Sequence, residues 1–242
     1  MSSSKELAFD GHDTPLILKA VSALVADPQK LKNDAQKLIF KVKDTNPGAS
    51  DTEIRKKCTE KIISQYSYYA AAGGVGAALP SVIPGIGQVA SIAGGAAADV
   101  ALSMKFQIEM VMELATVYGH DISEIEGQRL CYLIAGLGAV GQATSQGANK
   151  MASSAFIRVV NENLKGATLT AVKEAFKTIG VQFTKKGLVK AIPFGVGALV
   201  GGALNKGLTM YVGSKAVDFF EAEIKSIKNQ PQQPPEPEIV VN

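Results

Sequence analysis

One segment of the sequence has the glycine spacing of a dinucleotide-binding loop. Residues 136–141 read Gly-Leu-Gly-Ala-Val-Gly, a G-x-G-x-x-G pattern that follows the apolar run LCYLIA, and Glu162 lies where a ribose-binding acid would be expected. A nucleotide site also needs a strand before these glycines and parallel strands around them. The sequence offers no further convincing β-α-β unit, and similar glycine clusters occur twice more. We therefore interpret these glycines as helix-packing positions and expect no cofactor.

Other residues with catalytic or metal-binding side chains do not form a recognisable set. The two histidines, His12 and His120, lie far apart, and neither belongs to an H-x-x-x-H pair. The sequence contains neither a phosphate-binding G-x-x-x-x-G-K-[ST] loop nor a G-x-S-x-G nucleophile motif. Glu109 and Glu113 have helical spacing beside Lys105, which favours a solvated helix face. We expect a protein without catalytic or metal-binding residues.

Asp99 is the one charged residue between residues 67 and 104, and it borders an apolar run. Asp99, Ser103 and Gln107 share one helical stripe because they are spaced four residues apart. A buried carboxylate needs a partner or stays protonated. The stripe therefore predicts either a structural hydrogen bond from Asp99 or a polar site formed with Ser103 and Gln107.

The elements around this stripe are predicted to be helices. Pro15 begins an amphipathic helix that stops at Asp27–Pro28, Ser50 and Glu53 form a capping box, and Gly119 is a plausible helix stop. The pattern predicts an all-α fold: a compact multi-helix bundle with glycine-rich helical hairpins and a disordered C-terminal tail.

Two glycine-rich apolar segments interrupt the amphipathic pattern. Residues 67–98 carry no charge and are divided near their middle by prolines, so two full membrane spans of about 20 residues each do not fit. We expect a hairpin of two short arms over residues 70–98, buried in protein or dipped shallowly into one leaflet, and a related segment over residues 191–212. The candidate membrane or helix-packing positions are Gly73, Gly74, Gly76, Pro84, Gly85, Gly87, Gly94, Pro193, Gly195, Gly197 and Gly201.

The distribution of charge and the two cysteines bear on where in the cell the protein is expected to be. The net charge is +3, and residues 158–228 hold 11 basic against 5 acidic side chains, which fits either an anionic membrane surface or an ordinary solvated face. Cys58 and Cys131 form no metal-binding pattern and are expected to be buried free thiols in a reducing compartment. The first residues lack an apolar stretch, so we expect a cytoplasmic protein, either free or peripheral at the inner face of the membrane.

The order of these features resembles a known family. A glycine-rich segment, a Pro-Gly turn at 84–87, Ala98–Asp99 and the run Leu-Ala-Thr-Val-Tyr-Gly-His-Asp at 114–121 precede a second glycine-rich stretch with Asn205 and Gly213. Over roughly residues 20–225 this order resembles the EcsC family of bacterial proteins. The resemblance implies a helical fold, in some members associated with membranes, and it supplies no catalytic residues. Asp99, Tyr118, Gly119 and Asn205 match the pattern and are expected to be structural.

The predicted organisation is a flexible N-terminus (1–12), one helical domain (13–228) and a proline-rich disordered tail (229–242). The first hypothesis for function is a non-enzymatic protein that associates with a membrane through residues 70–98 and 191–212. The second is a soluble interaction or adaptor protein with a protein partner and the same segments buried as core. A third is a pore-forming or delivered toxin, and we expect no nucleic-acid partner in any of these cases.

Overall fold

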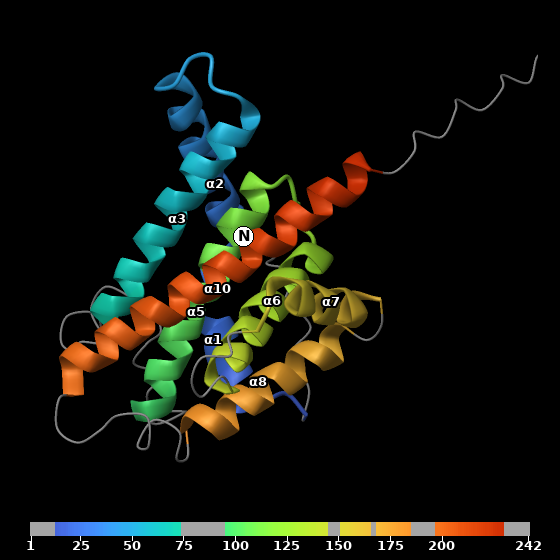
Figure 1. Cartoon of the computed structure of the whole chain (residues 1–242). Coiled ribbons are helices and arrows are strands. Elements are labelled where there is room, and N and C mark those ends of the chain that lie inside the picture. The colour runs from blue at the N-terminus through green and yellow to red at the C-terminus, as the bar shows by residue number, and fades with distance from the viewer. Residues whose placement is uncertain (1–12, 74–94, 145–150, 166–167, 185–196, 230–242) are drawn as a thin grey trace, which may run out of the picture.

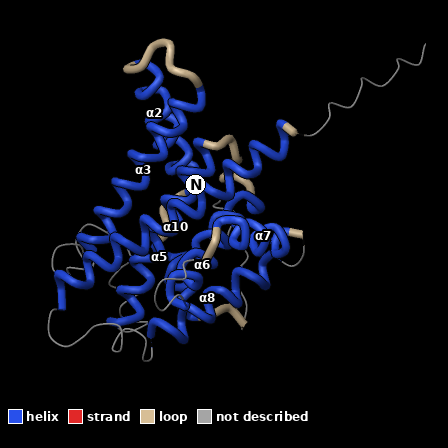
Figure 2. The backbone as a smooth tube through the Cα atoms, viewed as in Figure 1, coloured by secondary structure: helices blue, strands red, loops and turns tan. Residues whose placement is uncertain are grey.

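The computed structural model describes residues 13–73, 95–144, 151–165, 168–184 and 197–229, and these residues form eight helices and no strands (Figures 1 and 2). The helices are α1 (Leu16–Leu24), α2 (Pro28–Asp44), α3 (Asp51–Gly73), α5 (Gly95–Val117), α6 (Ile125–Thr144), α7 (Ser153–Leu164), α8 (Thr168–Thr184) and α10 (Gly197–Lys228). The predicted all-α bundle is confirmed. The predicted flexible N-terminus and nearly all of the predicted tail lie outside the described residues.

Local sequence signals fix several helix ends. The carboxylate of Asp27 accepts hydrogen bonds from the backbone amides of Gln29 and Lys30, and Pro28 occupies the first position of α2. The predicted capping box is present, because Glu53 accepts from the Ser50 amide at 2.8 Å and the Ser50 hydroxyl accepts from the Glu53 amide. Gly119 follows the end of α5 with φ +95°, a conformation that glycine adopts without steric cost.

Helix α5 is the centre of the bundle. It packs against α1, α2, α3, α6, α8 and α10, and Figure 1 shows it passing through the middle of the molecule. Between Val100 and Val117, only Lys105 and Thr116 are not buried. A buried polar side chain is normally hydrogen-bonded, so each buried polar side chain on α5 needs a partner inside the protein.

The helices α3, α5 and α10 cross where the α10 backbone has no side chain. A Cβ atom added at Gly213 would lie 2.9 Å from Cγ1 of Ile63 on α3 and 3.2 Å from Cε of Met110 on α5. Two other glycines serve contacts of α6: a Cβ at Gly136 would lie 3.2 Å from Ala175 and Phe176 of α8, and one at Gly138 would lie 3.2 Å from Val212 of α10. These glycines let helices approach closely.

Gly136 and Gly138 belong to the G-x-G-x-x-G pattern, and the structure places residues 136–141 in the interior of α6. The pattern therefore lies in a helix that packs on two others, and no strand precedes it among the described residues. Cys58 and Cys131 are buried free thiols, as predicted.

Candidate functional site

The predicted stripe on the first half of α5 is inside the protein. Ser103 and Gln107 are 8% and 0% exposed, and the Gln107 amide nitrogen donates to Oγ of Ser103 at 3.3 Å. The Gln107 carbonyl oxygen, Oε1, is buried without a hydrogen-bond partner among the described residues. Asp99 lies one turn earlier on the same helix, and its side chain is outside the described part of the structure.

A second polar stripe on α5 contains Lys105, Glu109 and Glu113, one turn apart. The interpretation of these residues as a solvated helix face is wrong, because Glu109 and Glu113 are 4% and 8% exposed. The reason is that α5 is enclosed by six other helices, so the side of α5 that carries the charges faces protein. The same i, i+4 spacing occurs on exposed helices, and it does not reveal burial.

The pair Lys105–Glu109 is satisfied within the bundle. The Lys105 amine lies 2.7 Å from both carboxylate oxygens of Glu109, and Oε1 of Glu109 also accepts from the backbone amide of Ala26 at 2.7 Å. The side chains are 12% and 5% exposed. The contact ties α5 to the short connection between α1 and α2, and it gives a buried carboxylate the hydrogen bonds it needs.

Glu113 has no cation within salt-bridge distance among the described residues. Its Oε1 accepts from the hydroxyl of Tyr66 on α3 at 2.7 Å. Burial raises the pKa of Glu113 to about 7, against the lowering effect of the Tyr66 hydrogen bond, while the negative charges of Asp34 and Glu109 raise it and Lys30 lowers it. Burial and the nearby carboxylates likewise raise the pKa of the Tyr66 phenol. Glu113 is thus a buried carboxyl that exchanges its proton near neutral pH.

A third polar cluster, which the sequence pattern did not indicate, joins α7 to α10. The Lys215 amine donates to Oγ of Ser153 at 2.8 Å and lies 3.2 Å from Oδ2 of Asp218, and the Ser153 hydroxyl donates to the same carboxylate. Serine beside lysine is a geometry that some hydrolases use. Here the hydroxyl donates to one partner and accepts from the other, so we interpret the cluster as a tie between the start of α7 and α10. Among the described residues, no three histidine, cysteine or acidic side chains are grouped to hold a metal ion.

A protein-family model for the EcsC protein family matches residues 16–222. The chain belongs to the EcsC protein family. A search of curated proteins and a search of solved structures each returned no match. The EcsC match extends from the start of α1 to near the end of α10, so it includes both polar stripes of α5 and the Ser153 cluster.

Tyr118 and the turn that follows it, which carry part of the EcsC resemblance, pack against α10 and α6. Tyr118 stacks on Phe220 of α10, with ring centroids 5.5 Å apart, and His120 lies 4.9 Å from the same ring. The backbone of the following turn lies against α6 at Gly127, where a Cβ would be 2.1 Å from the Asp121 carbonyl oxygen. Gly119 and Gly127 together allow this turn to connect α5 to α6. His120 Nε2 also lies 3.1 Å from a carboxylate oxygen of Glu223 on α10.

The exposed side chain of Asp121 stabilises the same turn between α5 and α6. Its carboxylate accepts from the Lys32 amine at 2.9 Å and from the Ser123 amide at 2.8 Å. These bonds lower the pKa of Asp121 to about 2. Asn205, the remaining residue of the EcsC pattern, is half-buried on α10.

The glycine-rich positions of this EcsC chain lie mostly outside the described residues. Those outside are Gly74, Gly76, Pro84, Gly85, Gly87, Gly94, Pro193 and Gly195. Gly73 is the last residue of α3, Gly197 is the first of α10, and Gly201 lies one turn further on. From Gly197 onward, the second glycine-rich segment is part of one continuous helix of 32 residues.

The helix ends that border these segments lie at the same end of the EcsC bundle, which we call the glycine-rich end. It comprises the end of α3, the start of α5, the end of α8 and the start of α10, at the lower left of Figure 1. Tyr68, Leu204 and Met210 are 61%, 49% and 49% exposed on the nearby turns of α3 and α10. The Lys206 amine lies over the Tyr68 ring, 4.1 Å from its centroid.

Proposed function

We propose that this EcsC-family chain is a non-enzymatic protein that associates with a membrane through the glycine-rich end of its bundle. The segments that make the contact are residues 70–98 and 191–212, and the position is peripheral, at the cytoplasmic face. No helix in the described part of the chain combines the length and the apolar character that crossing a membrane requires. The contact that we propose is shallow.

The observation that carries the proposal is the convergence of four helix ends. The chain leaves α3 at Gly73 and returns at Gly95, and it leaves α8 at Thr184 and returns at Gly197, all at one end of the bundle (Figure 1). Residues 67–98 carry no charge. Two segments that are separated by about a hundred positions in the sequence are thus attached to the same end, where they can act on one surface together.

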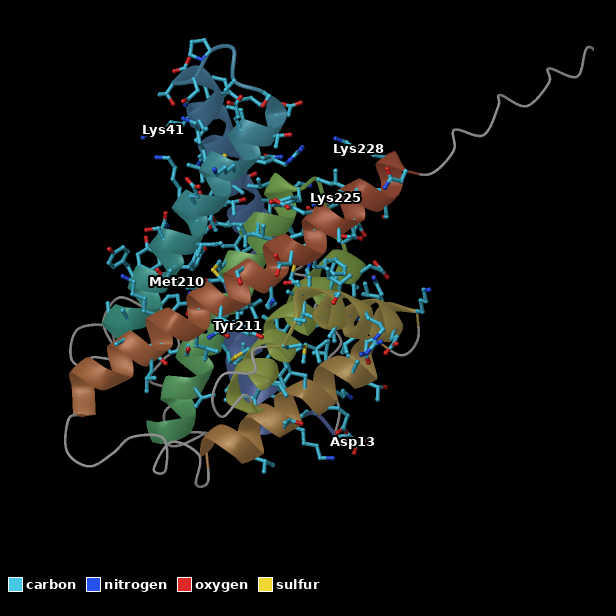
Figure 3. All side chains as sticks on the ribbon, in the orientation of Figure 1. Asp13, Lys41, Met210, Tyr211, Lys225 and Lys228 are labelled. Carbon is cyan, nitrogen blue, oxygen red and sulfur yellow. The ribbon has the colours of Figure 1, made fainter. Side chains whose placement is uncertain are left out.

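The exposed side chains at this end have the chemistry of a membrane interface. Tyr68, Leu204 and Met210 present apolar surface, and the Lys206 amine is held against the Tyr68 ring. Aromatic and lysine side chains are enriched where protein meets the headgroup region, because each has an apolar body and a polar end. Figure 3 shows Met210 on α10 well away from Lys225 and Lys228 near the other end of that helix.

The test is flotation of the purified full-length chain with neutral and anionic phospholipid vesicles at low and high salt. Flotation that survives high salt would support apolar insertion. Flotation restricted to anionic vesicles at low salt would assign the contact to basic residues such as Lys206, because salt screens exposed charges. A chain that never floats would contradict the proposal and would favour an adaptor protein whose glycine-rich end meets a protein partner.

Surface variants locate the contact. The triple variant Tyr68→Ser, Leu204→Gln and Met210→Gln changes exposed side chains at the glycine-rich end, and we expect it to weaken vesicle binding by about tenfold or more. The matched control is Phe40→Gln with Ile227→Gln, which removes side chains that are 74% and 68% exposed on α2 and on the last turn of α10. Equal loss in the two variants would mean that the contact is not confined to the glycine-rich end.

A further inference from the structure

Two buried polar groups near the glycine-rich end have no hydrogen-bond partner among the described residues. They are Oε1 of Gln107 on α5 and Oγ1 of Thr209 on α10. Both side chains are 0% exposed. Buried polar atoms in folded proteins are almost always paired, and each unpaired one lowers the stability of the state that buries it.

Helices α3, α5 and α10 cross near Gly213. Both unpaired groups lie about one helical turn from this crossing, in the direction of the glycine-rich end. The crossing is fixed by Gly213, which faces Ile63 and Met110. Thr209 precedes Gly213 by four residues on α10, and Gln107 precedes Met110 by three residues on α5, which is about one helical turn in each case. Both helices begin at the glycine-rich end, so the unpaired groups lie between the crossing and that end.

One side of the first half of α10 is exposed to solvent. Leu204 and Met210 are half exposed, and a Cβ added at Gly207 would meet no atom within 4 Å. The second half of the helix differs, because Phe219 and Phe220 are fully buried and Lys215 is tied to Ser153 of α7. Apolar contacts and satisfied hydrogen bonds therefore hold the second half at Lys215, Phe219 and Phe220. The first half instead buries the unpaired hydroxyl of Thr209.

We infer that Gln107 and Thr209 make the first half of α10 an opening element, which separates from α3 and α5 more readily than the rest of the bundle does. Opening gives both groups water as a partner, and it frees the apolar side of α10 at the glycine-rich end. The role we assign to the opening, to admit this half of α10 to a membrane surface, rests on the proposed function. The opening itself takes place in solution, without a membrane.

Hydrogen exchange of the full chain in solution tests the opening. Thr209→Val removes the unpaired hydroxyl with little change of shape, and Gln107→Met removes the unpaired carbonyl. We expect each to slow amide exchange of residues 197–212 by about tenfold, because the closed state no longer buries an unpaired group. The control is Thr116→Val, the same chemical change at the other end of α5, where the hydroxyl donates to the Met112 carbonyl at 3.1 Å. The inference would be overturned if Thr209→Val and Gln107→Met left the exchange rate unchanged. It would also be overturned if Thr116→Val slowed exchange of residues 197–212 by the same factor.

Vesicle binding by the same variants tests the role of the opening. We expect Thr209→Val to reduce the rate of apolar insertion about as much as it slows exchange. Slowed exchange with an undiminished insertion rate would overturn the assigned role. An unmodified chain that does not bind vesicles at all would contradict the proposed function, while the exchange results would still decide whether the first half of α10 opens.

Discussion

The two polar stripes of α5 lie on the same buried helix and differ in how completely their hydrogen bonds are satisfied. On the stripe of Lys105, Glu109 and Glu113, each charged group has a partner at about hydrogen-bond distance. On the stripe of Ser103 and Gln107, the amide oxygen of Gln107 has none among the described residues. The paired stripe extends toward the α2–α3 side of the bundle, and the unpaired stripe extends toward the glycine-rich end.

We infer that buried polar groups serve two purposes in this chain. Paired charges fix how α5 lies against α1, α2 and α3, because breaking a pair leaves a buried charge alone. Unpaired neutral groups do not fix the packing, and they lower the free energy needed to open the helices that bury them. The contacts of α5 with α1, α2 and α3 are thereby rigid, whereas the first half of α10 opens more readily.

The largest effect is expected from breaking the buried ion pair. Glu109→Leu leaves the Lys105 amine and the Ala26 amide without their acceptor, and we expect a loss of about 3–5 kcal/mol in the free energy of unfolding. Urea denaturation measures it. The double variant Lys105→Met with Glu109→Leu is expected to recover only part of the loss, because it removes the unpaired amine but leaves the Ala26 amide without an acceptor. A single variant that costs less than about 1 kcal/mol, as exposed pairs do, would contradict the rigid role of this stripe.

The next largest effect is a pH dependence of the free energy of unfolding, caused by Glu113. Its pKa rises from 4.5 to about 7 on folding, so the folded state holds the proton more tightly than the unfolded state does. The stabilisation is fully present below pH 4.5 and is lost as the pH rises through about 7. We expect Glu113→Gln to remove this slope, so that its stability relative to the unmodified chain increases by about 2–3 kcal/mol between pH 4.5 and pH 8.

The measurement is urea denaturation at several pH values, with Glu162→Gln, which changes an exposed residue on α7, as the control. A Glu113→Gln variant whose stability parallels that of the unmodified chain at every pH would show that Glu113 is not the buried proton acceptor.

A smaller loss of stability is expected from a change at Gly213, where α3, α5 and α10 cross. Gly213→Ala places a Cβ 2.9 Å from the Ile63 side chain, and overpacking of this kind costs about 1–3 kcal/mol. Because the crossing lies beside Thr209, hydrogen exchange of residues 197–212 should become faster together with the loss of stability. Unchanged stability would mean that α3 and α10 are not held closely at this point.

The smallest effect is a gain in stability. Gly207 lies on the exposed side of α10, where an added Cβ meets nothing within 4 Å. Gly207→Ala should stabilise α10 by about 0.5–1 kcal/mol, because glycine is a weaker helix former than alanine. Thermal unfolding of this variant beside Gly213→Ala compares the same substitution at an open and at a closed position of one helix. A loss at Gly207 would mean that the exposed side of α10 is covered in solution.

Local signals in the sequence predicted much of the fold. Pro28, the Ser50–Glu53 capping box and Gly119 mark helix ends because their effects act within one turn of backbone. The all-α bundle was predicted from the helical patterns, and the family from the order of the glycine-rich segments, the Pro-Gly turn and the run at 114–121.

The site was harder to predict because it depends on tertiary packing. The spacing of Glu109 and Glu113 is the same in an exposed and in a buried helix, and the neighbouring run of Phe106, Ile108 and Met110 was the available sign that α5 has no solvated side. The cluster of Ser153 with Lys215 joins residues that lie 62 positions apart in the sequence, so no local pattern could indicate it.

The most direct test of membrane contact at the glycine-rich end uses tryptophan as a reporter. The chain contains no tryptophan, so Leu204→Trp and Phe40→Trp each introduce one signal without background. With vesicles that contain brominated lipids, we predict a blue shift and quenching of the emission from Leu204→Trp, and neither change from Phe40→Trp. If the emission from Leu204→Trp stays unshifted and unquenched while the protein is bound to vesicles, the glycine-rich end is not the membrane contact.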